Sequence, residues 1–223
     1  MMDRRRLAIF SAVVVGAMFV LSAWAWLTLP ADAQVPIHWG PDGQVDGYAS
    51  KTVGLLLLPL ITIGVAALFW VIPVIEPRRA NFEKSGKAYG AIWIAVVLLM
   101  ATIDVVIVAA AMGADLDMTL IVFVATGALF IVIGNYLPKV RSNYLMGIRT
   151  PWTLTSELSW DKTHRAGGRL FVIEGILFII VGLLRPAPEF LIVVLIGGIV
   201  VMLLFVFGYS YRVWLTDPAR RQA

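Results

Sequence analysis

The chain has 223 residues, of which 60% are hydrophobic and 14% are charged, and its formal net charge is +4. Soluble domains are about half apolar and about a quarter charged, so this composition favours an integral membrane protein. The positive charge is scattered over polar segments between apolar stretches. It is therefore an orientation signal, which argues against a nucleic-acid surface. The chain contains no cysteine, which excludes disulfides, thiolate metal ligands and cysteine nucleophiles.

Six apolar stretches are long enough to cross a bilayer, and they are continuous rather than alternating, which predicts helices and not a β-barrel. We expect spans at residues 7–29, 53–75, 88–112, 118–137, 170–184 and 190–211. The basic start resembles that of a signal peptide, but the first apolar run is too long for one, which favours an uncleaved anchor. The predicted fold class is an all-α integral membrane protein with six transmembrane helices, a structured outer loop and a short interfacial helix in the inner loop.

Lysine and arginine alternate along the chain between cation-rich and cation-poor connecting segments. The cation-rich segments are the N-terminus, residues 76–87, residues 138–169 and a C-terminal tail that includes Arg220 and Arg221. The cation-poor segments are residues 30–52, 113–117 and 185–189. The positive-inside rule then predicts that both termini and the 138–169 loop are cytoplasmic.

The six spans divide into two halves of three. Residues 1–112 contain the outer loop 30–52, and residues 113–223 contain the inner loop 138–169. Each long loop begins with Leu-Pro, which is compatible with an inverted repeat. The alternative is that Leu-Pro is only a common helix stop, because proline cannot continue a hydrogen-bonded helix.

The outer loop is rich in glycine and proline, which predict tight turns. His38 with Asp42 and Asp46 would suit zinc chemically. However, this face has a single histidine and no EF-hand spacing, which favours a rigid loop in which His38 is hydrogen-bonded. The candidate ligand-binding residues of this loop are His38, Trp39, Asp46, Tyr48 and Lys51.

The inner loop is the longest polar run in the chain. We expect Pro151 to start a new segment, Thr153 or Thr155 to cap a short helix that runs to about Arg165, and Gly167-Gly168 to break that helix before the fifth span. His164 is either a proton switch or an interfacial histidine satisfied by a carbonyl or a headgroup. The candidate residues for binding a partner or a headgroup are Asn143, Arg149, Trp152, Trp160, His164 and Arg165.

Two acidic residues fall inside predicted spans, Asp104 in the third and Glu174 in the fifth. An ionised carboxylate at the centre of a membrane helix costs roughly 3 kcal/mol on insertion scales. Asp104 therefore either lines a polar, proton-linked cavity or is a neutral or paired structural residue.

Two runs of residues resemble a known family. The first reads Leu29-Pro30, Val35-Pro36-Ile37-His38-Trp39-Gly40 and Asp46-Gly47-Tyr48-Ala49-Ser50-Lys51. It resembles the N-terminal domain of unknown function often found in SdpI-like proteins. The second reads Gly134-Asn135-Tyr136-Leu137-Pro138, Asn143-Tyr144-Leu145-Met146-Gly147-Ile148-Arg149-Thr150-Pro151-Trp152, Trp160 and Thr163-His164-Arg165. It resembles the SdpI-family core.

The resemblance implies a polytopic protein of the bacterial inner membrane, with no established catalytic residues. The characterised member protects its producer from a secreted toxic peptide and helps relay its presence to a repressor held at the membrane. We therefore expect an immunity and signalling protein with no cofactor. Its expected partners are the bilayer, a secreted peptide outside, and a cytoplasmic regulator or anionic lipid inside.

Two other function classes are alternatives to this expectation. One is a proton-linked transporter that uses Asp104 and Glu174. The other is a membrane enzyme acting on lipid or cell-wall substrate with His38 or His164 as base. The absence of a nucleophile–base pair makes an enzyme the less favoured class.

Overall fold

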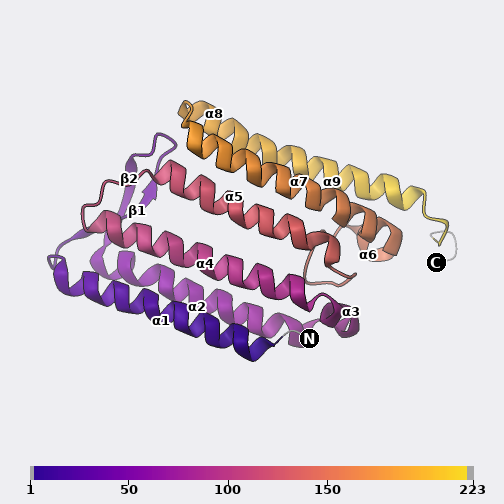
Figure 1. Cartoon of the computed structure of the whole chain (residues 1–223), viewed down its shortest axis with the longest axis horizontal. Helices are drawn as coiled ribbons and strands as arrows, with labels where there is room; N and C mark the ends of the chain where they lie inside the picture. The colour runs from indigo at the N-terminus through magenta and orange to yellow at the C-terminus, as the bar shows by residue number, and fades with distance from the viewer. Residues whose placement is uncertain (1–2, 220–223) are drawn as a thin grey trace.

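The computed structural model describes residues 3–219, so Arg220 and Arg221 of the cation-rich tail lie outside the described residues. Within that range six helical segments are long and apolar enough to cross a membrane. They run alongside one another as a bundle (Figure 1). The first four are α1 (Arg4–Thr28), α2 (Lys51–Ile75), α4 (Gly86–Ala111) and α5 (Met118–Tyr136), which a 3-10 helix, η1 (Leu137–Lys139), continues. The last two are α7 (Glu157–Leu184) and a composite of α8 (Pro188–Ile192), the π-helix η2 (Val193–Gly197) and α9 (Gly198–Leu215). The predicted all-α, six-span fold is confirmed.

The shorter elements gather at the two ends of the bundle. At one end, β1 (Gln34–Trp39) pairs antiparallel with β2 (Val45–Ser50). This hairpin lies beside the α4–α5 and α7–α8 turns (Figure 1). At the other end lie the start of α1, α3 (Arg79–Lys84) and α6 (Pro151–Thr155). The two motif-rich loops are therefore at opposite ends of the bundle.

The helix predicted to run from a Thr153 or Thr155 cap to about Arg165 is the start of α7, and the expected break at Gly167-Gly168 is wrong. The short helix α6 ends at Thr155, and Ser156 is extended with φ −143°. The Ser156 hydroxyl then accepts a hydrogen bond from the Ser159 N–H at 2.9 Å and starts α7, which continues through both glycines. A serine cap separates the two helices, and the glycines serve packing instead.

Helices α5 and α7 are in backbone contact through facing glycines. A Cβ atom on Gly127 would lie 2.5 Å from the Gly175 carbonyl oxygen, and one on Gly134 would lie 2.5 Å from the Gly168 carbonyl oxygen. Because lipid tails are as apolar as leucine, helices in a membrane associate through close van der Waals packing, which small residues permit. This pair of helices therefore forms the tightest interface of the second half.

Helix α2 contains two prolines, and each deprives the carbonyl four residues earlier of its helical N–H donor. The carbonyl oxygen of Leu55, freed by Pro59, accepts a hydrogen bond from the Ser22 hydroxyl of α1 at 2.8 Å. The carbonyl oxygen of Phe69, freed by Pro73, accepts one from the Tyr89 hydroxyl of α4 at 2.6 Å. Neighbouring helices thus supply the donors that α2 lacks, as the apolar surroundings require.

This arrangement allows a reciprocal stability test. Replacing Ser22 with alanine leaves the Leu55 carbonyl without a donor, and we expect the free energy of unfolding in mixed micelles to fall by about 1 kcal/mol. Because Pro59→Ala restores an N–H, the Ser22→Ala Pro59→Ala double variant should recover most of that loss. Thr28→Ala is the matched control, since the exposed Thr28 hydroxyl bonds only within its own helix. A double variant no more stable than Ser22→Ala would contradict the assignment.

Candidate functional site

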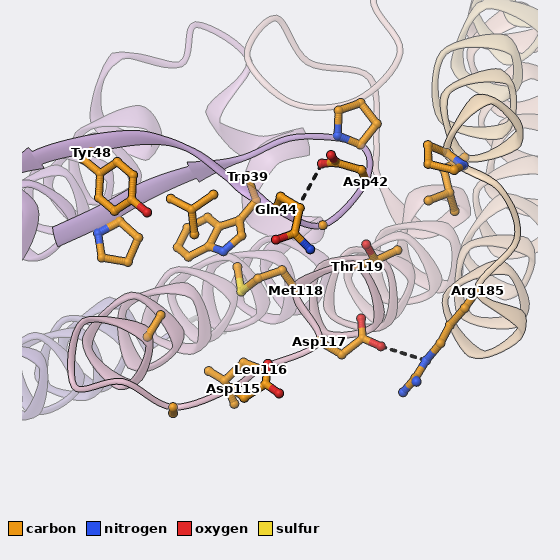
Figure 2. Close-up of a pocket in the computed structure, with 18 of the residues that line it drawn as sticks. Trp39, Asp42, Gln44, Tyr48, Asp115, Leu116, Asp117, Met118, Thr119 and Arg185 are labelled. Atoms are coloured by element: carbon orange, nitrogen blue, oxygen red, sulfur yellow. Dashed lines mark hydrogen bonds and ion pairs between the residues drawn. The ribbon is translucent and has the colours of Figure 1, made fainter.

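A pocket of about 750 Å³ opens at the hairpin end, where three segments distant in the sequence meet. The hairpin, the α4–α5 turn and the α7–α8 turn each form one wall. Figure 2 shows Asp42 and Gln44 on the hairpin side, with Asp117 and Arg185 from the two turns joined across the opposite side. No single predicted loop contains this site, because its walls come from both halves of the chain.

The polar lining of this pocket has a net negative charge. Its charged side chains are three aspartates and one arginine. Asp117 uses one carboxylate oxygen to cap α5 through the Leu120 N–H at 2.8 Å and the other to pair with Arg185 Nε at 2.7 Å. Asp42 accepts only the Gln44 N–H at 3.1 Å, and neither it nor Asp115 has a cationic partner among residues 3–219. The pocket therefore favours a cationic group.

Arg185 is held in an unusual backbone conformation. It caps the C-terminus of α7 with φ 49°, and within the described residues it is the only residue other than glycine with a positive φ. A left-handed conformation costs an L-residue roughly 1–2 kcal/mol. The ion pair with Asp117 opposes that cost and fixes the guanidinium in the wall of the pocket.

An apolar groove of about 380 Å³ adjoins the polar pocket. Its walls are spanning residues of α4, α5, α8 and η2 together with the tip of the hairpin. Trp39 and Met118 line both cavities, so the hairpin tip stands between a polar compartment and an apolar one.

The five outer-loop residues predicted from the sequence take different positions. Trp39 lines both cavities and Tyr48 lines the polar one. His38 Nδ1 lies 2.5 Å from Asp46 Oδ1 across the hairpin, and both side chains are exposed. Lys51 is buried, donates to the C-cap carbonyl of α1 at 2.7 Å and stabilises the negative end of that helix dipole. Within residues 3–219, no three histidine, aspartate or glutamate side chains are grouped closely enough to hold a metal ion.

His164 attaches the inner loop to α7 at the opposite end of the bundle. Its Nε2 accepts the Ile148 N–H at 3.0 Å, so the ring proton is on Nδ1, which donates to the Trp160 carbonyl oxygen at 2.9 Å. The ring also stacks on Trp160 with centroids 4.0 Å apart. Both nitrogens are used in the neutral tautomer, which favours the alternative of a histidine satisfied by backbone groups over a proton switch.

A pair of residues from the 76–87 segment, missed in the sequence, supports the same loop. Glu76 is buried, and its carboxylate accepts the N–H groups of Arg78 at 2.9 Å and Tyr144 at 3.1 Å. The Arg78 guanidinium donates to Ser142 and to the Leu154 carbonyl oxygen and lies 4.5 Å from the Tyr144 ring centroid. In the sequence both residues counted only as loop charges that indicate membrane orientation, and nothing there indicated that they contact the inner loop.

The remaining predicted inner-loop residues range from buried, through the half-buried Trp152, to exposed. The side-chain oxygen of Asn143, Oδ1, accepts two loop N–H groups at 2.7 and 2.9 Å, and Trp160 Nε1 donates to the backbone carbonyl oxygen of Val140 at 2.8 Å. Trp152 packs on α9. Arg149 and Arg165 are exposed, and Arg165 lines a groove of about 510 Å³ with Arg169. The exposed arginines are thus the ones available to a partner.

Both intramembrane carboxyls are buried, and each has an oxygen without a hydrogen-bond partner among the described residues, Asp104 Oδ2 and Glu174 Oε1. The Glu174 carboxyl occupies the space where residue 198 of α9 has no side chain, because a Cβ atom on Gly198 would collide with it. The π-helix η2 immediately precedes that glycine. Nothing places the two carboxyls in one site.

Several pocket residues were missed as a site although the sequence contained a signal. Asp115 and Asp117 form an acidic turn, and Arg185 is the sole cation of its connecting segment. Both segments were assigned to the same face of the membrane, so their opposite charges could have been paired. The contribution of Met118 and Thr119 depends on helix packing and had no such signal.

The contact between Gly147 and His164 predicts a specific loss of stability. Gly147 has φ 105°, and a Cβ there would collide with His164 Nε2, whereas Gly113 has φ 87° with nothing within 4 Å. Both alanine substitutions should strain the backbone, but Gly147→Ala should cost a further 1–3 kcal/mol or so. We expect faster amide exchange at Leu145, Met146 and Ile148 in Gly147→Ala only. Equal losses in the two variants would contradict a role for the His164 contact.

The comparisons with known proteins agree with the motifs. Residues 13–63 match a domain of unknown function, DUF1648, and residues 139–210 match the SdpI/YfhL protein family. The immunity protein SdpI of Bacillus subtilis is 24% identical over 204 residues, which cover 92% of this chain and 94% of the relative. No solved structure matches. The chain is thus a multi-pass membrane protein homologous to an immunity protein, with an N-terminal region that matches DUF1648 and a C-terminal region that matches the SdpI/YfhL family.

Proposed function

We propose that the chain is a membrane immunity protein that protects its cell by binding a secreted antimicrobial peptide at the hairpin-end pocket. The observation that carries this proposal is the similarity to an immunity protein over nearly the whole of both chains. The pocket supports it further, because its walls combine the hairpin of the DUF1648 region with the α4–α5 and α7–α8 turns of the second half. Trp39 and Tyr48 are the aromatic residues proposed to contact the peptide.

The proposed orientation places the hairpin end outside a bacterial inner membrane and both termini in the cytoplasm. Asp32, Asp42, Asp46, Asp115, Asp117 and Glu189 belong to the segments at the hairpin end, which have Lys51 and Arg185 as cations. The segments at the other end hold most of the lysines and arginines, as the positive-inside rule expects of a cytoplasmic face.

The inner end is proposed to hold a cytoplasmic regulator or anionic lipid. The network around Glu76, Arg78 and His164 gives the loop a fixed shape. Arg149 and Arg165 remain exposed on that shape. A rigid loop with exposed guanidinium groups suits a partner with carboxylate or phosphate groups, which arginine binds in a bidentate manner.

The second candidate function is proton-linked transport. It is favoured by Asp104 and Glu174, each of which keeps a buried oxygen without a partner in the described part of the chain. A carboxyl that binds and releases a proton during transport would be expected at such a depth.

A survival assay separates these functions. The chain is expressed in a sensitive bacterium and challenged with a panel of purified secreted antimicrobial peptides. We expect protection that Trp39→Ala reduces by at least about tenfold in tolerated peptide concentration, as for an aromatic anchor in an interface. Asp104→Asn should keep protection. Trp70→Ala is the control for losing an exposed tryptophan distant in sequence from the hairpin.

The outcomes differ between the hypotheses at equal expression. If protection is lost with Asp104→Asn and kept with Trp39→Ala, the protein acts as an exporter and does not protect by binding the peptide. Absence of protection against every peptide of the panel would contradict the immunity proposal.

A further inference from the structure

We propose that the polar pocket and the apolar groove form a single two-part site for a cationic amphipathic peptide. The inference rests on the proposed function and adds the chemical class of the ligand. In this arrangement the cationic end of the peptide lies between Asp42 and Asp115, and an apolar segment lies in the groove along α4, α5, α8 and η2.

The two cavities are continuous at the hairpin tip. Both are lined by the tip residues Trp39, Pro41 and Gly43, and also by Met118, Thr119 and Leu191. Together they provide about 750 Å³ of polar space and about 380 Å³ of apolar space. A ligand that satisfies both must change from polar to apolar along its own length.

The groove selects the apolar part of the ligand. Its outer walls include Val122, Ile192 and Leu195, which are 42%, 41% and 39% exposed in the isolated chain. The single titratable side chain of its lining is His38, which is already paired with Asp46. A charged group in this groove would lose its hydration with no partner in the lining, so an apolar segment is the occupant that fits.

The polar pocket determines the sign of the charge at the polar end of the ligand. The ion pair of Asp117 with Arg185 is internally neutral, so Asp42 and Asp115 determine the sign. Exposed carboxylates add little affinity each, but they steer a cationic partner and reject an anionic one. A phospholipid reaching this place would bring its phosphate against these carboxylates, which disfavours lipid relative to a peptide with lysine or arginine at one end.

The binding test uses the full chain in phosphatidylcholine nanodiscs, which carry no net charge. The probes are two synthetic peptides with the same ten-residue apolar segment and either three lysines or three glutamates at one end. The lysine peptide should bind at least about tenfold tighter than the glutamate peptide, and this preference should shrink as salt rises. The Asp42→Asn Asp115→Asn variant should lose the preference. Asp32→Asn, an exposed aspartate outside both cavities, should keep it.

The position of the peptide is tested separately. Because the chain has no cysteine, a fluorophore on Leu195→Cys labels the groove alone. A quencher on the apolar end of the lysine peptide should quench this label, and one on the lysine end should not. The Asp42→Asn Asp115→Asn variant leaves the groove intact, so quenching of the Leu195→Cys label still reports the position of the peptide in that variant.

Several outcomes would overturn the proposal: equal binding of the two peptides, no binding of the lysine peptide, or a preference that survives in the double variant. Quenching of the Leu195→Cys label by nitroxide lipid with no response to peptide would show that lipid occupies the groove. Any of these results together with protection in the survival assay leaves the immunity proposal standing and removes only this ligand class. Lysine-peptide binding without protection would instead support the ligand class and contradict the immunity proposal.

Discussion

The constraint on which the structure depends is that no backbone polar group can be left unpaired in an apolar medium. Helix α2 alone would leave two carbonyl groups unpaired, those freed by Pro59 and Pro73. The hydroxyls of Ser22 in α1 and Tyr89 in α4 donate hydrogen bonds to these carbonyls. The three helices of the first half are therefore joined by requirements of the backbone as well as by side-chain packing.

This constraint also positions the hairpin. Leu55 lies in the second turn of α2, next to Gly54, where a Cβ atom would collide with Val35 of β1. The base of the hairpin is thus seated on the same turn that Ser22 stabilises. In the second half the glycine contacts between α5 and α7 bring the adjacent turns together, and the ion pair of Asp117 with Arg185 joins them. The outer pocket forms where these two assemblies meet.

The sequence determined most of the fold and little of the site. The spans follow from continuous hydropathy, and the two polar ends follow from the alternation of charge, because both are properties of single segments. The partners Ser22 and Leu55, or Asp117 and Arg185, are far apart along the chain and meet only through packing. Gly167 and Gly168 show a second reason why the sequence was not sufficient. A glycine pair interrupts helices in water, but between membrane helices it permits close approach. Among the candidate residues of the outer-loop motif, Trp39 and Tyr48 line the pocket, whereas Lys51 is used by the fold, a difference that depends on packing and is absent from the motif itself.

The buried carboxyls explain why we favour peptide binding over proton-linked transport as the function. Glu174 fits only because residue 198 is glycine, so its carboxyl is part of the packing between α7 and α9. Asp104 belongs to α4 in the other half. The two cavities at the hairpin end and the groove beside Arg165 are lined by neither carboxyl. A transport path would have to open through helix contacts that glycines and proline-freed carbonyls hold closed, whereas the pocket at the hairpin end is already formed. The same close packing that disfavours a path through the bundle gives the hairpin and the two turns a fixed geometry, which is what recognition of a ligand requires.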